Sequence, residues 1–372
     1  MATPITIPLS YNPIDISKLS EVLTRYDGVH HNQIVADFER TLSETTGAPH
    51  VVALNSGTSA IHLALKVLGV EAGDYVIVPT FTYVATINPV RYLGAIPVFI
   101  DSEPETWNMN PHLLEQAIQD LKREGKPLKA IILVHTYGMP CKLDDILQLA
   151  DYHKIPVVED AAESLGSTYR GQQVGTFGDI GIYSFNNNKI VTTYGGGALV
   201  AKRPDWIQKA RFYASQAREQ LPYYEHKEVG YNLAMSPLCA ASGITQLPEL
   251  GRRIKDRREI FEYYSTSLSG YEVQFQSENE DNRSNRWLSA VLFKDLATKD
   301  RVTSVLASEG IETRPLWRPM HDQPVFLTYK KYANDLSMDY FNRGLCLPSG
   351  GDLQAEALQK VVELLKQKLG YK

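Results

Sequence analysis

VVALNSGTSAIHLALKVLGV, residues 51–70, passes from a short apolar run into a longer amphipathic one across a polar turn. Residues 51–54 have the composition of a β-strand, and residues 59–70 have the apolar spacing of an α-helix. The same alternation continues downstream, where we predict strands at residues 75–79, 96–101, 129–135, 155–160, 181–185 and 197–201. Because most of these runs are apolar throughout and alternate with helices, they predict a mostly parallel α/β sheet covered on both faces.

The pattern changes near residue 250, after which the elements are those of a smaller α/β unit. We predict a charged helix at residues 252–270, a polar loop at 276–286 and a strand at 287–293. Two further helices are predicted at residues 301–310 and 356–370. About the first 30 residues are expected to be irregular, with one short helix. The sequence therefore predicts a large domain over residues 1–250, including the N-terminal segment, and a small C-terminal domain over residues 251–372.

The composition is that of a soluble globular protein and argues against several classes of function. The 372 residues are 43% hydrophobic and 22% charged, and the net charge of -5 favours neither nucleic acid nor an anionic membrane as a partner. No apolar run approaches the ~20 residues of a membrane-spanning helix, and the first residues do not resemble a signal peptide. The scattered Cys141, Cys239 and Cys346 argue against a disulfide framework or a metal site, and favour the cytoplasm.

Polar residues follow several predicted strands, at the sheet edge where open α/β sheets bind ligands. The turn at residues 55–59 opens a helix, and its free backbone N–H groups at Gly57, with the hydroxyl group of Thr58, suit a phosphate. A simple helix cap is the alternative interpretation. Tyr83 follows another strand and could present an aromatic face, although an aromatic residue in such a place is more often part of the core.

Asp160 and Lys189 are two further candidates. Asp160 ends an apolar strand, where a carboxylate is costly without a positive partner. Its alternative role is to cap a helix over residues 161–166, with Glu163 placed as in a capping box. Lys189 lies between two predicted strands with no acidic residue within five positions. A partly desolvated lysine amine can form a Schiff base, whereas an exposed surface charge is the default alternative.

Together these features are the parts that a pyridoxal phosphate site needs. A lysine can form the Schiff base, and an acid can keep the pyridine nitrogen protonated so that the ring accepts electrons from a substrate carbanion. An aromatic side chain can cover one face of the ring. A dinucleotide site is not favoured, because no G-x-G-x-x-G motif follows a predicted strand.

Four blocks carry a family resemblance: NSGTSAIHLAL, PTFTYVATINPV, VVEDAAESLGSTYRGQQVGTFGDIGIYSFNNNK and GYNLAMSPLCAA. From about residue 25 to the C-terminus, the chain resembles the DegT/DnrJ/EryC1/StrS family of sugar aminotransferases. The resemblance implies the aspartate-aminotransferase-type fold, which is α/β and is fold type I of the pyridoxal-phosphate-dependent transferases. It also implies pyridoxal 5'-phosphate as the cofactor, with pyridoxamine 5'-phosphate formed during turnover.

The resemblance further implies roles for particular residues. Lys189 would hold the cofactor and move the proton, and Asp160 would pair with the ring nitrogen. The other cofactor contacts would come from Tyr83 on the ring face, Glu163 near the ring hydroxyl, and Gly57, Thr58 and Ser184 at the phosphate. Asn232 would reach the phosphate of a partner subunit, which implies a homodimer with active sites at the interface. Lysine at position 189, where a related dehydratase branch has histidine, favours transamination over deoxygenation.

A finer resemblance lies in EDAAES, SFNNNK, TTYGGG, YEHKEVGYN, RPLWRPMHDQPVF and GLCLPSG. It implies amination at C4 of UDP-2-acetamido-2,6-dideoxy-4-ketohexose, with glutamate as the amino donor. Arg314, Trp317 and His321 would contact this substrate, with core packing as the alternative for Trp317 and a solvated face as the alternative for Arg314. Synthases of GDP-perosamine, which aminate GDP-4-keto-6-deoxymannose, aminotransferases of 3-keto sugars, and a regulatory protein of this fold are the alternative functions.

Overall fold

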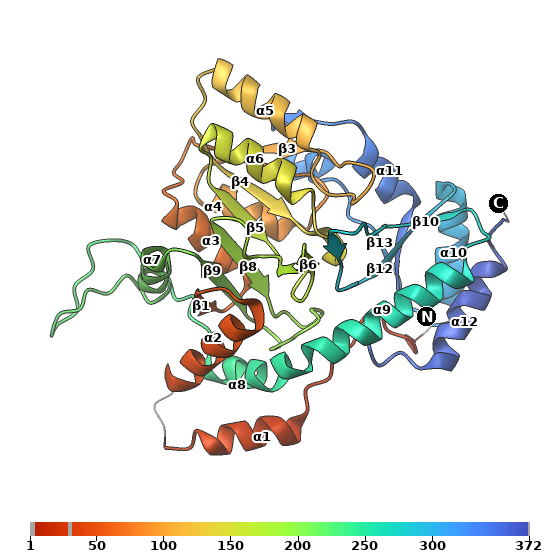
Figure 1. Ribbon diagram of the computed structural model, residues 1–372, viewed down its shortest axis with the longest axis horizontal. Helices are drawn as coiled ribbons and strands as arrows, with labels where there is room; N and C mark the ends of the chain where they lie inside the picture. Colours follow the sequence, from red (N-terminus) through yellow and green to blue (C-terminus); the bar gives the residue numbers. More distant parts are fainter. Residues whose placement is uncertain (1–3, 29–31, 371–372) are drawn as a thin grey trace.

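The protein is built around one eight-stranded sheet, shown by a computed structural model that describes residues 4–28 and 32–370 (Figure 1). Its strand order is β1-β9-β8-β5-β4-β2-β3-β14. The strands are β1 (His50–Leu54), β2 (Tyr75–Pro79), β3 (Ile96–Ile100), β4 (Leu128–Val134), β5 (Val157–Asp160), β8 (Ile180–Ser184), β9 (Gly197–Ala201) and β14 (Lys331–Tyr332). Only the pairs that β9 forms with β1 and β8 are antiparallel, so the mostly parallel sheet predicted from the sequence is confirmed.

Helices cover both faces of this sheet, because its strands are apolar on both sides. On one face Val52, Val78 and Val158 lie in one core with Leu63 and Ala64. That face carries α3 (Gly57–Val67), α4 (Asn88–Tyr92) and α7 (Pro204–Ala214). The other face carries α2 (Asn32–Thr46), α5 (Pro111–Arg123), α6 (Leu143–His153) and α8 (Pro237–Gln246), and α1 (Ile16–Arg25) contacts α8 (Figure 1).

After residue 250 the chain forms a second, smaller unit around an antiparallel sheet of order β10-β12-β15-β13. Val291, Phe293, Leu345 and Val361 lie in its separate apolar core. Its strands are β10 (Val273–Phe275), β12 (Ser289–Phe293), β13 (Arg314–Pro315) and β15 (Gly344–Leu347). Its helices are α9 (Leu250–Ser267), α10 (Leu296–Ser308), α11 (Leu336–Arg343) and α12 (Ala355–Lys366).

Several segments connect the two units. The N–H groups of Thr6 and Ile7 donate to the Gly310 carbonyl (2.8 and 3.2 Å), and Ile7 is buried in the smaller core. In the opposite direction, β14 adds to the edge of the large sheet beside β3. A three-stranded sheet is shared, with β11 (Asn282–Arg283) beside β6 (Thr168–Tyr169) and then β7 (Gln172–Gln173). The division of the chain at residue 250 stays a proposal.

The predicted elements occur with shifted ends. The helix predicted at 301–310 begins at Leu296, because Asp295 caps it by accepting a hydrogen bond from the Thr298 N–H (2.8 Å). The predicted loop 276–286 contains the short strand β11. Single turns of 3₁₀ helix also occur, at η1 (Val84–Thr86), η2 (Thr136–Gly138), η3 (Leu247–Glu249), η4 (Met320–Asp322) and η5 (Pro324–Phe326). Within the described ranges, none of the helices combines the length and apolarity that crossing a membrane requires.

Candidate active site

The turn between β1 and α3 forms the first wall of the site. Ser56 caps α3, because its hydroxyl oxygen accepts a hydrogen bond from the Ser59 N–H at 3.1 Å. Gly57 and Thr58, in the first turn of the helix, line a cavity of about 420 Å³. Their N–H groups lie where an α-helix offers no acceptor of its own. The helix cap and the candidate phosphate site are therefore neighbours within one turn, and the two interpretations do not exclude each other.

Glycines allow a close approach where this turn meets the neighbouring strands. A Cβ atom at Gly57 would lie 3.0 Å from Cβ and 3.3 Å from Oγ of Ser184 at the end of β8. A Cβ atom at Gly197 would lie 2.4 Å from the Gly57 nitrogen. The missing side chains let β9 run against the start of α3 and bring the Ser184 hydroxyl beside it. A helix N-terminus with an added hydroxyl donor is suited to a phosphate group.

Asp160, at the end of β5, is one of two buried acids that line the cavity, the other being Glu163. Its carboxylate accepts hydrogen bonds from Thr86 Oγ1 at 2.8 Å and from the Ala162 N–H at 3.1 Å. Burial raises the pKa of Asp160, against these hydrogen bonds, which lower it. The alternative role as a helix cap is wrong, because residues 161–166 form turns rather than a helix. A positively charged donor entering from the cavity would stabilise this carboxylate.

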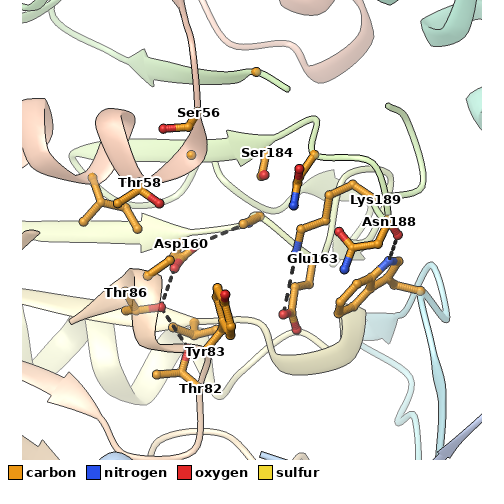
Figure 2. A pocket seen from close by; sticks show the side chains of 18 of the residues that line it. Ser56, Thr58, Thr82, Tyr83, Thr86, Asp160, Glu163, Ser184, Asn188 and Lys189 are labelled. Atoms are coloured by element: carbon orange, nitrogen blue, oxygen red, sulfur yellow. Dashed lines mark hydrogen bonds and ion pairs between the residues drawn. The ribbon is translucent and has the colours of Figure 1, made fainter. Parts of the chain in front are cut away.

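Lys189 reaches the same cavity and is not an exposed surface residue, since only 13% of its side chain is accessible. Its Nζ lies 3.7 Å from Glu163 Oε1 and 4.2 Å from the ring centroid of Trp287. Glu163 is held in turn by the N–H of Tyr137, which donates to Oε2 at 2.8 Å. Burial raises the pKa of Glu163, while the charge of Lys189 lowers it. The amine therefore lies close to both a carboxyl group and an indole ring, and Figure 2 shows the Lys189 side chain extending toward Glu163.

Aromatic rings form the wall of the cavity near its opening. The rings of Tyr83 and Trp317 lie 5.4 Å apart at an interplanar angle of 46°, and Tyr83 is 54% exposed. Trp317 also stacks on Tyr137 at 5.7 Å, and its backbone N–H donates to the Tyr137 hydroxyl at 3.0 Å. Figure 2 shows Tyr83 close to Asp160 and Thr86. A planar ring bound between Lys189 and Asp160 would meet these aromatic faces.

Seven of the cofactor residues predicted from the sequence line this one cavity: Gly57, Thr58, Tyr83, Asp160, Glu163, Ser184 and Lys189. Of the predicted substrate residues, Trp317 lines it too. The exposed Arg314 instead pairs with Glu312 at 2.6 Å. His321 is buried and shares a hydrogen bond of 2.7 Å between its Nδ1 and Thr80 Oγ1, and burial lowers its pKa.

Asn232 lies elsewhere, in a second cavity with Gln216, Arg218, Tyr224 and His226. This cavity lies on the segment after α7, part of which extends away from the body of the protein (Figure 1). Asn232 is therefore not among the residues that line the Lys189 cavity. The position of Asn232 is compatible with a contact to another subunit, which stays a proposal.

Sequence reasoning missed several residues of the site. Trp287 was assigned only to a strand, yet its indole lies over the Lys189 amine and its Nε1–H donates to the Asn188 carbonyl at 2.8 Å. Thr82 and Thr86 form a hydrogen-bonded pair (2.9 Å) that leads to Asp160. The interaction of Trp287 with Lys189 spans almost a hundred residues of sequence and has no local signal. Thr82 and Thr86 lie beside Tyr83 in the block PTFTYVAT, which was the available signal.

A lysine, a buried acid and a helix N-terminus with hydroxyl donors, gathered at the carboxyl ends of parallel strands, define the class of pyridoxal-phosphate-dependent α/β enzymes. The chain belongs to the DegT/DnrJ/EryC1/StrS aminotransferase family, whose model matches residues 14–366. It is thus a pyridoxal-phosphate-dependent sugar aminotransferase of fold type I, as the sequence predicted.

Individual relatives agree with this assignment. The chain is 47% identical to the protein EpsN of Bacillus subtilis (strain 168) over 337 residues, which cover 89% of this chain and 87% of EpsN. It is 35% identical to the GDP-perosamine synthase of Escherichia coli O157:H7, with 90% and 89% of the two chains covered. Among solved structures, the sugar aminotransferase Spr1654 of Streptococcus pneumoniae in its PMP form has a TM-score of 0.89 at 26% identity, covering 98% and 99% of the chains.

The donor set of the cavity fits pyridoxal phosphate. The free N–H groups at the start of α3, beside the Ser184 hydroxyl, suit a phosphate, and the buried carboxylate of Asp160 suits a protonated ring nitrogen. Lys189 is the lysine of the cavity lining, so its amine can bind the cofactor aldehyde. These residues would hold the cofactor through the amine of Lys189 and the carboxylate of Asp160.

Proposed function

We propose that this protein transfers the amino group of glutamate to C4 of a nucleotide-linked 4-keto-6-deoxy sugar, and that the sugar is UDP-2-acetamido-2,6-dideoxy-4-ketohexose. The family supports the aminotransferase reaction on a sugar. The observation that carries the sugar assignment is the position of Trp317. The sequence block that resembles the UDP-sugar branch, RPLWRPMHDQPVF, supplies this indole to the cavity, 5.4 Å from Tyr83.

The residues of the cavity divide the work as follows. When bound, the cofactor supplies an electron sink and carries the amino group between the two substrates. Lys189 moves a proton to and from the carbon that carries the amino group, and Glu163, 3.7 Å away, orients the amine. Asp160 accepts the hydrogen bond of the protonated ring nitrogen. Thr58 and Ser184 donate to the phosphate together with the backbone at Gly57, and Tyr83 and Trp317 exclude water from one side.

We also propose that the active protein is a cytoplasmic homodimer. The segment after α7 carries the exposed apolar side chains Tyr223, Tyr224 and Val229, which are 60%, 77% and 82% exposed in the single chain. Exposed apolar side chains gathered on one segment mark an interaction surface. In a symmetric dimer each copy would cover the site of the other, and Asn232 would reach the phosphate of its partner. Arg314 and His321, which do not line the Lys189 cavity, would contact the nucleotide part of the substrate.

A half-reaction tests the proposed substrate. The purified protein is converted with glutamate to its pyridoxamine phosphate form, the glutamate is removed, and UDP-2-acetamido-2,6-dideoxy-4-ketohexose is added while the absorbance spectrum is recorded. We expect glutamate to bleach the cofactor band and the sugar to restore it. The two-stage exchange also predicts parallel lines in initial-rate plots.

A second candidate is amination of GDP-4-keto-6-deoxymannose, which is favoured by the 35% identity to a GDP-perosamine synthase. Return of the band with the GDP-linked 4-keto sugar alone would replace the UDP-linked substrate by this one. Return of the band with a 3-keto sugar alone would assign the amination to C3 instead of C4. The variant Lys189→Ala serves as the control, because it should show neither bleaching nor recovery with any of the sugars.

A further inference from the structure

Three consecutive carbonyl groups around Lys189 are each held by a side chain from a distant part of the chain. The Asn188 carbonyl accepts a hydrogen bond from Trp287 Nε1 at 2.8 Å. The Lys189 carbonyl accepts one from Asn12 Nδ2 at 2.8 Å, and the Ile190 carbonyl accepts one from Arg253 Nη1 at 3.0 Å. The donors lie 99, 177 and 63 residues away in sequence, on three separate segments. The backbone that carries the reactive lysine is thus fixed by tertiary contacts.

Arg257 connects two of these three donors. It lies on α9, is fully buried, and donates through Nη1 to the carbonyls of Trp287 and Ser349. Through Nη2 it donates to Ser10 Oγ at 3.1 Å and to Asn12 Oδ1 at 3.2 Å. The segment that holds Asn12 and the residue that covers the Lys189 amine therefore meet on one guanidinium group.

This buried arginine is costly to the fold. None of the acceptors named for it is a carboxylate, and burial, with the nearby charge of Arg253, lowers the pKa of Arg257 to about 10. A buried cation that hydrogen-bonds only neutral groups costs more desolvation energy than an apolar side chain of the same size. Stability alone is a weak reason for such a residue, whereas the geometry of its acceptors provides a specific one.

The hydrogen bonds of Asn12 allow one orientation of its amide group. A guanidinium group only donates, so it requires the amide oxygen of Asn12. A backbone carbonyl only accepts, so the carbonyl of Lys189 requires the amide nitrogen. A reversed amide would face donor to donor at Arg257 and acceptor to acceptor at Lys189. Arg257 thereby sets the direction of the hydrogen bond that Asn12, which is 5% exposed, makes to Lys189.

Trp287 is the second residue through which Arg257 is linked to Lys189. Its backbone carbonyl is held by Arg257, its Nε1–H holds Asn188, and its ring centroid lies 4.2 Å from the Lys189 amine. A shift of Trp287 would therefore move the backbone at Asn188, and it would also move the indole ring that contacts the Lys189 amine.

We propose that Arg257 is a positioning residue for Lys189. It does not touch the amine, and it acts through Asn12 and Trp287 to fix the backbone at residues 188 and 189. This fixes the path along which Nζ approaches the cofactor and the carbon that gains or loses the proton. The inference rests on the proposed role of Lys189 and extends it to the smaller C-terminal unit, from which the positioning group comes.

The experiment uses the full-length protein with three variants. Arg257→Lys keeps a positive charge but replaces the planar guanidinium group, whose two nitrogens donate to Trp287 and to Asn12, by a single ammonium group. Asn12→Ala removes the link to the Lys189 carbonyl from a segment outside the sheets, so it provides a second test even if Arg257→Lys unfolds the protein. Arg252→Lys is the matched control, because Arg252 is on the same helix but pairs at the surface with Glu249 and Asp256.

Three measurements are made: the kinetics with glutamate, which give kcat and KM, the pH midpoint of the absorbance of the loaded protein, and a labelling rate for the unloaded protein. The labelling rate is the rate at which added pyridoxal phosphate becomes attached to Lys189. The attached group is trapped with borohydride and located by mass spectrometry. For Arg257→Lys and Asn12→Ala we expect kcat to fall by about 10²-fold, as for a misplaced reacting group, with KM nearly unchanged. The labelling rate should fall and the pH midpoint should shift, while Arg252→Lys matches the wild type in all three.

The opposite results are distinguishable. If Asn12→Ala and any folded Arg257→Lys protein keep the wild-type kcat, pH midpoint and labelling rate, Arg257 has no positioning role. The same conclusion follows if activity falls only in proportion to the folded fraction seen in thermal melting. If Lys189→Ala itself keeps activity, the proposed role of Lys189 fails first, independently of the Arg257 result.

Discussion

Glu159 and Asp160 are neighbours in β5, and their carboxyl groups serve opposite faces of the central sheet. Glu159 accepts hydrogen bonds from His135 Nε2 at 2.9 Å and from backbone N–H groups that include those of Phe177 and Gly178, both at 2.8 Å. Burial would raise the pKa of Glu159, but these donors lower it below its ordinary value. Burial raises the pKa of Asp160, which faces the cavity with fewer donors. The carboxyl group of Glu159 is thus hydrogen-bonded by groups of the protein itself, whereas the carboxyl group of Asp160 can accept a further hydrogen bond from a ligand.

The unliganded protein should gain stability when Asp160 is changed to asparagine. Because the folded-state pKa of Asp160 is raised, its carboxyl group stabilises the fold below the unfolded pKa of about 3.9, and this contribution is lost as the pH rises through the folded pKa. The asparagine side chain does not ionise, so the Tm of Asp160→Asn should exceed that of the wild type by a few degrees near pH 8.

Thermal melting without cofactor, at several pH values between 4 and 8, checks this. The difference in Tm should shrink toward low pH, as Asp160 becomes protonated in both states. With pyridoxal phosphate bound the order should reverse, since the variant lacks the charge that pairs with the ring nitrogen. A Tm of the unliganded variant below that of the wild type at pH 8 would contradict this account.

Glu159→Gln should destabilise the protein without a direct effect on the cavity. The donors around Glu159 share two carboxylate oxygens, whereas glutamine offers one acceptor oxygen. We therefore expect a loss of about 1.5–3 kcal/mol in the free energy of unfolding. Since the folded-state pKa of Glu159 is lowered, its contribution is present above the unfolded pKa of about 4.3 and is lost as the pH falls through the folded pKa. Urea unfolding at pH 7 and near pH 4 measures this, with Glu259→Gln at the surface as the control.

Lys189→Ala should reduce both half-reactions by at least about 10²–10⁴-fold, because the general base is removed. The fold should be retained, since the Lys189 carbonyl still accepts its hydrogen bond from Asn12. Half-reaction rates and the melting temperature are measured together, with Lys255→Ala, whose side chain is 73% exposed, as the control. Wild-type turnover in Lys189→Ala would overturn the central assignment.

Gly57→Ala should weaken binding of pyridoxal phosphate more than it affects folding. The added methyl group would lie 3.0 Å from Ser184 Cβ, so the hydroxyl beside the phosphate must move. Gly251→Ala, on α9, is the matched control, because nothing lies within 4 Å of its added Cβ atom. That control should be stabilised by up to about 1 kcal/mol, as alanine is the better helix former. Cofactor titration followed by fluorescence compares the two variants, and equal affinities would place the phosphate elsewhere.

Mixed dimers test whether Asn232 acts across a subunit interface. Lys189→Ala and Asn232→Ala should each be inactive or nearly so. After the two variants are unfolded and refolded together in equal amounts, half of the dimers are hybrids, and each hybrid has one intact site if Asn232 serves its partner. The expected activity is then about a quarter of the wild-type value. If Asn232 serves its own chain, the hybrids contain no intact site and the mixture stays inactive.

The order of the strands along the chain and the main contents of the cavity could be predicted from the sequence, because they have local signals. A buried parallel strand is a continuous apolar run, and its last polar residue lies at the ligand-binding edge. For this reason Asp160, Lys189 and the turn at Gly57 were identified without a structure, and all three line one cavity. The family blocks added Glu163 and Ser184, which line the same cavity.

Only the tertiary structure decided which distant groups act on those residues. It places Trp287 against the Lys189 amine and lets Arg257 hold Trp287 and Asn12 together. It also separates Glu159, which the fold itself satisfies, from Asp160 beside it. A hydrogen bond between residues 177 positions apart leaves no periodic or compositional trace in the sequence. The sequence therefore determined the residues with local patterns, whereas long-range packing decided how Lys189 is held.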